Sequence, residues 1–494
     1  MHPKAIAILI CLGLYVSVIA QSGTQKKGPG KTALLADLDL YRHILEKAHA
    51  GLYKYHTKKQ VDSLFDHYRQ QIRPGTTLLD FYRYVSTILS YIGSLHDDVS
   101  LPQSYLDSMV TRPAFFPYPV SVVNNKLLVN IDGQQIPAGA EIVSINGLPL
   151  PSILPRLYKY YTTDGLNTTG KLLGIGSSFS LFYRYEFGPV QQFHVVYKPF
   201  PSQQTASTTL PAVTYRDYQI LRKKRHSLYL DTLLDNRYTF QLIDSLQAAI
   251  LTVNTFSLGN ATSPKHAAYK QFLQQSFATL KEKKIRHLVV DIRKNGGGSD
   301  PNDLLTYSYL TDHPFKENKQ AFTLFQKVPY RQYFYTDDST DITDIEENFL
   351  EEHNQLRQGR YYQNPDFNPF WQPDSLAFKG RIYLLIGPAV ASAASLFASM
   401  VRSDEGSSLV IGEESMGGYY GHTGHNSVAY ELPHTHINFS FSVVDLLQYV
   451  EKKKEIPFGS GIKPHHIVTQ SQQDFISNRD AVMQFTLGLI RGKN

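Results

Sequence analysis

Apolar residues recur at helical spacing near the start of the chain. Those between residues 61 and 72 share one helix face, and those between residues 81 and 95 share another. Thr57 stands before the first stretch and the pair Thr76-Thr77 before the second, and threonine is a favoured residue at a helix N-terminus. The pattern therefore predicts a helical region over residues 32–112, whose aromatic stripes belong to a hydrophobic core.

Further along the chain, the apolar spacing shortens to strand length. Residues 127–131 (LLVNI) and 141–147 (EIVSING) have the composition of strands, and residues 137–139 (PAG) mark a turn between them. We expect a small β domain over residues 113–200. The polar and then basic residues 201–237 are expected to form a linker.

From residue 238 onward, strand-length and helix-length segments alternate. Strands are predicted at residues 248–253, 288–292, 381–386 and 409–411, and helices at residues 265–281 and 392–402. Such alternation is typical of an α/β core with a largely parallel sheet, here over residues 238–490. Residues 315–378 are too long for a simple connection, so we expect an inserted lid or surface subdomain there.

Composition is that of a globular protein. The chain has 494 residues, 42% of them hydrophobic and 19% charged, which suits about two or three domains. The formal net charge of +6 is small for this length, and basic residues alternate with acidic ones. We therefore expect no nucleic-acid partner.

Residues 1–20 have the pattern of a secretory signal peptide. Lys4 precedes an apolar run at residues 5–19, which is too short to span a membrane, and Ala20 ends a small-residue cleavage site. The only cysteine, Cys11, lies in this run, so the mature chain has no disulfide and no transmembrane segment. Export to a periplasm or to the extracellular space follows, with lipidation of Cys11 as a disfavoured alternative.

Three consecutive glycines follow a buried strand in the segment HLVVDIRKNGGGSD (residues 287–300). Gly296, Gly297 and Gly298 indicate a backbone that turns sharply or approaches a ligand closely. Ser392 lies at a second junction between a strand, a loop and a helix, where helix N–H groups point outward. The two junctions together supply a candidate nucleophile and main-chain donors for an oxyanion.

These motifs resemble those of the C-terminal processing (tail-specific) serine peptidases. Residues 291–298 (DIRKNGGG) resemble the family's Asp-hydrophobic-Arg-x-Asn-x-Gly-Gly signature, and Ser392-Ala-Ala resembles its nucleophile motif. Further segments match the family in order along the chain, at residues 49–53, 92–102, 410–418, 432–433 and 461–464. The ordered set makes the resemblance specific, although each motif alone is short.

The resemblance implies an α/β core of the ClpP/crotonase type, a mixed sheet with helices, preceded by an N-terminal helical domain. It also implies a PDZ-like domain at residues 113–200, since residues 139–147 (GAEIVSING) are similar to the PDZ core. PDZ domains bind peptides by adding a strand to a sheet edge. A small β-barrel that acts only as a spacer is the alternative.

The general base also follows from the resemblance. One branch of the family uses a lysine after its Gly-Glu pair, but the matching residue here is Gly418. The tricorn-like branch uses a histidine from the N-terminal part instead. Its closing Val-x-Leu-Pro segment is similar to residues 99–102 and aligns His96 with the catalytic histidine. For the orienting acid, Glu455 is the candidate, with Glu451 and Ser94 as alternatives.

The resemblance thus implies an exported serine endopeptidase that acts on peptides or proteins and needs no cofactor. Ser392 would form an acyl-enzyme with His96 as base, and N–H groups of Ala393 and of Gly297 or Gly298 would hold the oxyanion. This mechanism requires the serine and the histidine to approach within about 2.6–3.2 Å, although they are distant in sequence.

Departures from the family pattern leave a second function open. Leu95 and Asp97 replace the usual Gly and Thr beside the histidine, and Ser395 replaces a Glu in the nucleophile motif. A catalytically weakened or inactive protein of this fold, binding a peptide or a small ligand, is the alternative.

Four histidines have spacings that can bind zinc: His422, His425, His434 and His436. No glutamate occupies the general-base position of an HExxH motif among them. We expect loop histidines here and no metal.

The targeting pattern makes a direct prediction about the mature protein. Its N-terminus is expected at Gln21 or within a few residues of it, because signal peptidase cleaves after small residues such as Ala20. N-terminal sequencing of the exported protein checks this. An intact Met1, or lipid on Cys11, would contradict it.

Overall fold

The computed structural model describes residues 28–226, 236–335, 342–404, 406 and 408–492. The expected signal peptide lies outside these residues, so its cleavage stays a prediction. Within the described ranges, no helix is both long and apolar enough to cross a membrane.

The expected N-terminal helices are present as α1 (Lys31–Ala48), α2 (Lys58–Gln71) and α3 (Leu78–Ile92). Thr57 and Thr77 each close a capping box at the start of α2 and α3, which satisfies main-chain N–H groups that the helices leave unpaired. The predicted helix starts are therefore confirmed. The short helix α4 (Gln103–Val110) follows.

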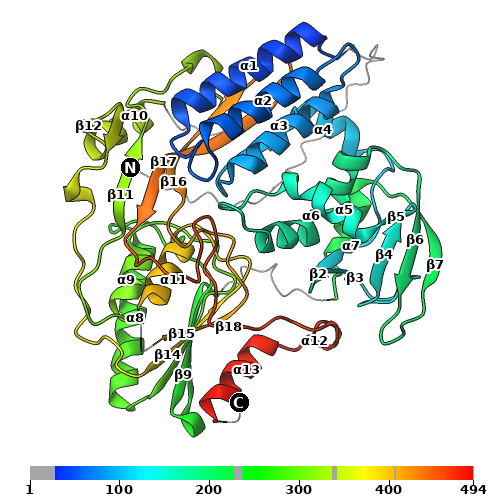
Figure 1. Cartoon of the computed structure of the whole chain (residues 1–494). Coiled ribbons are helices and arrows are strands. Elements are labelled where there is room, and N and C mark those ends of the chain that lie inside the picture. The colour runs from blue at the N-terminus through cyan, green and yellow to red at the C-terminus, as the bar shows by residue number, and fades with distance from the viewer. Residues whose placement is uncertain (1–27, 227–235, 336–341, 405, 407, 493–494) are drawn as a thin grey trace.

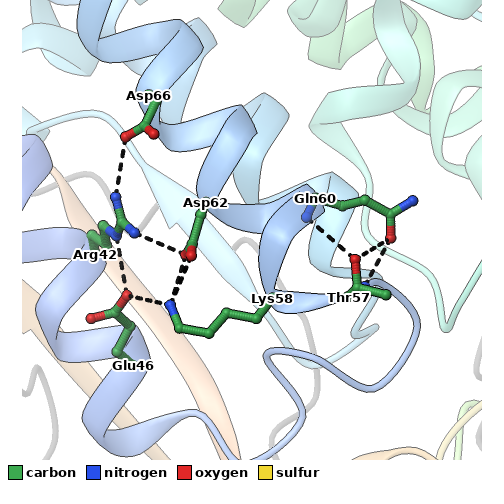
Figure 2. Close-up of polar contacts among 7 residues, drawn as sticks. All are labelled: Arg42, Glu46, Thr57, Lys58, Gln60, Asp62 and Asp66. Atoms are coloured by element: carbon green, nitrogen blue, oxygen red, sulfur yellow. Dashed lines mark hydrogen bonds and ion pairs between the residues drawn. The ribbon is translucent and has the colours of Figure 1, made fainter.

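An ion network joins α1 to α2 (Figure 2). Arg42 bonds to Glu46 on its own helix and to Asp62 and Asp66 on α2, and Lys58 also contacts Glu46 and Asp62. All five side chains are partly or well exposed, so the network contributes little stability and mainly fixes how the two helices lie.

The first sheet combines segments from three parts of the chain. Its strand order is β1-β17-β11-β13-β12, with β16 paired to β17. The bounds are β1 (Asp98–Ser100), β11 (Asn318–Thr323), β12 (Gln355–Arg357), β13 (Arg360–Tyr362), β16 (Thr423–Glu431) and β17 (Asn438–Gln448). Residues 315–378, expected as a lid or subdomain, thus add strands to a sheet, together with α10 (Ile342–Glu352).

The N-terminal helices lie along this first sheet, where α1 and α2 run beside β16 and β17 (Figure 1). Tyr41 of α1 meets Phe439 of β17 edge to face, with ring centroids 4.7 Å apart. Both residues belong to one buried cluster that continues through α3 and into the second sheet. The helices therefore share their core with the sheet and do not bury a separate one.

The second sheet is antiparallel, in the order β2-β3-β4-β6-β7, with β5 paired to β4. Its strands are β2 (Val120–Val123), β3 (Lys126–Val129), β4 (Glu141–Ile145), β5 (Leu148–Pro149), β6 (Gln192–Lys198) and β7 (Ala206–Pro211). The helices of this part are α5 (Leu150–Leu157), α6 (Thr169–Phe187) and α7 (Tyr215–Arg222). The expected linker at residues 201–237 thus contains a strand and a helix. The PDZ-like identity stays a prediction.

The third sheet has the order β18-β15-β14-β10-β9-β8, and every pair in it is parallel except β8 with β9. Its strands are β8 (Tyr238–Ile243), β9 (Ala248–Val253), β10 (His287–Asp291), β14 (Arg381–Ile386), β15 (Ser408–Gly412) and β18 (His466–Ile467). The predicted largely parallel sheet is confirmed.

Helices cover both faces of this third sheet. On one face lie α8 (Pro264–Glu282), α9 (Asn302–Ser308) and α11 (Ala393–Ser403), and on the other lies α13 (Ala481–Ile490). The short helix α12 (Gln472–Ile476) packs instead against the second sheet, where Phe475 is buried with Val123 and Leu128. Short 3₁₀ helices lie at Tyr158–Tyr160, Asp244–Leu246, Arg331–Tyr333 and Pro365–Phe367. Because β10 and β14 are parallel neighbours, the loops that follow them leave the same edge of the sheet.

Candidate active site

Ser392 occupies the sharp junction between β14 and α11. Its backbone has φ +51° and ψ −134°, a conformation that L-residues rarely adopt and that surrounding structure must hold in place. Its side chain does not cap α11, which removes the ordinary structural reason for a serine at a helix start. A strained turn between strand and helix is the geometry in which enzymes present a nucleophilic serine.

The Ser392 hydroxyl instead contacts His96. The distance from Ser392 Oγ to His96 Nε2 is 3.1 Å, although the two residues are 296 positions apart. His96 lies in the loop between α3 and β1, and β1 pairs with β17 of the first sheet. The proximity that a Ser–His mechanism requires is present.

Buried contacts on either side of His96 hold its loop. Asp97 Oδ2 bonds to His49 Nε2 at 2.9 Å with both side chains fully buried, and the His49 ring stacks on Phe441 of β17. The Thr162 hydroxyl donates to the Asp97 carbonyl at 2.8 Å. These contacts fix the backbone that carries His96, although none of them reaches its imidazole.

Asp164 ties the histidine loop to the loop after β15. One carboxylate oxygen accepts from the Leu95 N–H at 3.0 Å and the other from the Gly418 N–H at 2.9 Å. Burial raises the pKa of Asp164 to about 7, and the two N–H groups oppose this rise. Sequence reasoning missed this residue because a lone Asp in the sequence TTDG resembles an ordinary turn.

The His96 imidazole is partly buried and is neutral at physiological pH. Burial lowers the pKa of His96 from its usual 6.5 to about 4, while the nearby main chain of Thr423 and the charge of Asp97 raise it in part. The Nδ1 atom has no hydrogen-bond partner of ordinary geometry within the described residues. The His422 ring lies beside it, with ring centroids 5.1 Å apart. A neutral imidazole can accept the proton of a serine hydroxyl.

The three candidates for the orienting group do not contact His96. Glu455 is 58% exposed, and its carboxylate bonds to Arg402 at 2.7 Å. Glu451 is engaged through its main-chain N–H, which donates to Ser403 Oγ. Ser94 is buried close in sequence, but its hydroxyl makes no hydrogen bond among the described residues.

The glycine loop lies against the nucleophile. A Cβ on Gly297 would come within 2.7 Å of the Ser392 Cβ, so only glycine fits at this contact. The Gly297 N–H donates to the buried Asn295 side chain at 2.9 Å and is therefore not available to a substrate. Over the described ranges, the N–H groups of Gly298 and Ala393 make no such bond and remain as candidate oxyanion donors.

Comparisons with known proteins find a family and solved structures that this chain resembles. Residues 247–468 match the model of peptidase family S41. Mature CPAF in complex with lactacystin shares 14% identity and a TM-score of 0.60, covering 94% of this chain and 99% of that one. Mature CPAF alone gives 14% identity, 94% and 98% coverage, and a TM-score of 0.60. At these identities the likeness shows a common fold.

A weaker match is the photosystem II D1 C-terminal processing protease, with 14% identity, 90% and 97% coverage, and a TM-score of 0.38. A search of curated protein sequences finds no match.

The Asp164 tie makes a prediction about reactivity. Asp164→Asn keeps one acceptor oxygen and loses the other, so either Leu95 or Gly418 is released and the His96 loop shifts. We expect labelling by a serine-reactive fluorophosphonate to slow by about 10–100-fold, because small misplacements of catalytic groups are costly. Circular dichroism should show an intact fold. Asp132→Asn, at a surface carboxylate bonded to His226, is the control and should label at the normal rate. Equal labelling rates for the two variants would contradict the role of Asp164.

Proposed function

We propose, from the membership of residues 247–468 in peptidase family S41, that this protein is a serine peptidase acting on peptides or proteins with Ser392 as nucleophile and His96 as general base. The observation that carries the proposal is the 3.1 Å contact between a strained serine and a neutral, partly buried imidazole. The signal-peptide pattern at residues 1–20 supports an exported enzyme.

The chemistry proceeds through an acyl-enzyme. Ser392 Oγ attacks the scissile carbonyl carbon while its proton passes to His96 Nε2. The N–H groups of Ala393 and Gly298 donate to the oxyanion of the tetrahedral intermediate. As the intermediate collapses, the C–N bond breaks and His96 returns its proton to the leaving amine. Water then attacks the ester carbon and gives a proton to His96. As the C–O bond to Ser392 breaks, His96 passes this proton to Ser392 Oγ, and the acid product and free Ser392 are released.

His96 is held through its backbone in this proposal. The contacts of Asp97 with His49 and of Asp164 with Leu95 place the loop, while burial keeps the imidazole neutral. Glu455 is left out of the mechanism because its exposed carboxylate is bonded to Arg402.

A peptidase is favoured over a binding protein of the same fold. A module that only binds a ligand has no need of a serine in a costly backbone conformation whose hydroxyl meets an imidazole. The replacements Leu95, Asp97 and Ser395 also have structural places here. Leu95 and Asp97 help to hold the His96 loop, and the Ser395 hydroxyl donates to the Ser392 carbonyl at 2.7 Å.

Labelling with a fluorophosphonate tests the nucleophile without knowledge of the substrate. The mature protein should be labelled on the peptide that contains Ser392, and Ser392→Ala should abolish the label while the fold is kept. His96→Gln should slow labelling by at least about 100-fold, the usual loss when a general base is removed. Ser399→Ala, at a buried serine on the same helix, should label normally. Label on another serine would refute the assignment.

The lowered pKa of His96 predicts that the labelling rate falls at an unusually low pH. Since the base must be neutral, the labelling rate should stay level from pH 7 to about 5 and fall only as pH passes through about 4. An unperturbed histidine would lose activity below its pKa of 6.5. Stability should also decline between pH 6.5 and 4, because the unfolded chain takes a proton there that the folded chain refuses. Labelling rates are compared only at pH values where circular dichroism shows a folded protein. A fall in the labelling rate with its midpoint near pH 6.5 would contradict a neutral base with a lowered pKa.

A further inference from the structure

Asp300, Glu317 and His425 converge beside the candidate active site. One side-chain ligand atom from each lies within 4.8 Å of those of the other two. Asp300 follows the glycine loop two residues after Gly298, Glu317 stands just before β11, and His425 lies on β16. The histidine spacing in the sequence singled out His425, but the two acids come from segments far apart in sequence, so no local motif brings the three residues together.

Two buried carboxylates at this cluster, Glu317 and the nearby Asp303, have unpaired oxygen atoms among the described residues. Glu317 is only 7% exposed, and its Oε1 atom makes no hydrogen bond in the described part of the chain. The distance from Glu317 Oε1 to His425 Nε2 is 3.8 Å, which is too long for a hydrogen bond. Asp303, at the start of α9, is fully buried, and among the described residues neither of its oxygens has a hydrogen-bond partner of ordinary geometry.

The unpartnered groups also affect one another. Burial, together with the charges of Asp300 and Glu317, raises the pKa of Asp303 well above its usual range. Burial and the charge of Asp300 likewise raise the pKa of Glu317. An unpaired buried carboxylate is costly, so such a cluster either holds protons or binds a cation.

The imidazole distinguishes a metal from other cations. Two carboxylates and one histidine are a donor set that Zn²⁺ and related transition metals accept in proteins, with further positions left for water. Ca²⁺ and Mg²⁺ prefer oxygen ligands alone. Asp300 is exposed and the His425 side chain is 25% exposed, so an ion can reach the cluster from solvent.

We propose that Asp300, Glu317 and His425 bind a divalent transition-metal ion, for which Zn²⁺ is the probe, with Asp303 supporting the site from the protein interior. The ion would join the loop after Gly298 to β16, three residues beyond His422, and so brace one wall of the candidate active site. It takes no part in the peptidase chemistry, and the site stands independently of the proposed function.

Metal binding to the full mature chain tests the proposal directly. After dialysis against EDTA, calorimetric titration with ZnCl₂ should give one ion per chain, and saturating Zn²⁺ should raise the melting temperature by at least about 2 °C. CaCl₂ should produce neither effect. The Ser392→Ala variant should bind Zn²⁺ as the wild type does, which separates the metal site from the peptidase proposal.

Matched variants locate the ion. Glu317→Gln and His425→Gln should each weaken Zn²⁺ binding by at least about 10-fold, since even the outer partners of metal ligands matter by 10–100-fold. Glu431 and His436 form another carboxylate–imidazole contact, at 2.7 Å on an exposed surface. Glu431→Gln and His436→Gln are therefore the controls and should bind Zn²⁺ normally. Circular dichroism of each EDTA-treated variant establishes that it is folded.

Three outcomes would overturn the proposal. The first is a wild-type protein that neither binds Zn²⁺ nor gains stability from it. The second is unchanged binding in both Glu317→Gln and His425→Gln. The third combines two results. The EDTA-treated Glu317→Gln variant has the same melting temperature as the wild type in saturating Zn²⁺, and the melting temperature of the wild type does not change with metal. That result would mean that the cluster holds shared protons.

Discussion

The contact between His96 and Ser392 constrains how the whole chain must fold. It joins a loop of the N-terminal helical region to a turn of the α/β core across 296 residues of sequence. A hydrogen bond tolerates displacements of only a few tenths of an ångström, whereas two loops on separately moving units wander much further. The site can therefore exist only if the region carrying His96 is packed firmly against the core.

The packing supplies that firmness at several levels. Pairing of β1 with β17 anchors the chain directly after the histidine, and the aromatic contact of Tyr41 with Phe439 continues the same core into α1. Asp164 then fastens the loop itself to Gly418. Because interiors are close-packed, a shared core of this kind resists hinge motion. The serine and histidine are thus already in contact in the free protein, and their approach needs no closure by a substrate.

The sequence allowed the scaffold to be predicted, because apolar periodicity reports burial directly. Strands such as β10 and β14 are continuous apolar runs, and their parallel pairing places the glycine loop beside Ser392. Polar strands are harder to predict. Strand β7 (ASTTLP) has the composition of a linker, yet it pairs along the edge of the second sheet.

The roles of isolated polar residues are harder still to predict from the sequence, since their partners depend on the tertiary structure. Nothing in the sequence distinguishes Asp164, which fastens two loops, from Glu455, which is bonded to Arg402 at the surface. Similarly, only the backbone geometry shows that the N–H of Gly297 is already used by Asn295.

Buried acids fall into two groups around this site, and the difference lies in their donors. Asp97 and Asp164 are buried but engaged, the first by His49 through one of its two oxygens and the second by two main-chain N–H groups on both oxygens. Such bonds repay desolvation and make each carboxylate a fastener of local structure. Asp303 and Glu317 are equally buried, yet three of their four oxygens lack any hydrogen bond among the described residues. Next to His96, buried acids have hydrogen-bond donors around them, and the loop that carries the histidine is held rigidly. Where acids are left without donors beside an imidazole, a metal ion has the charge and the ligand preference to act as the missing partner, as we propose for this cluster.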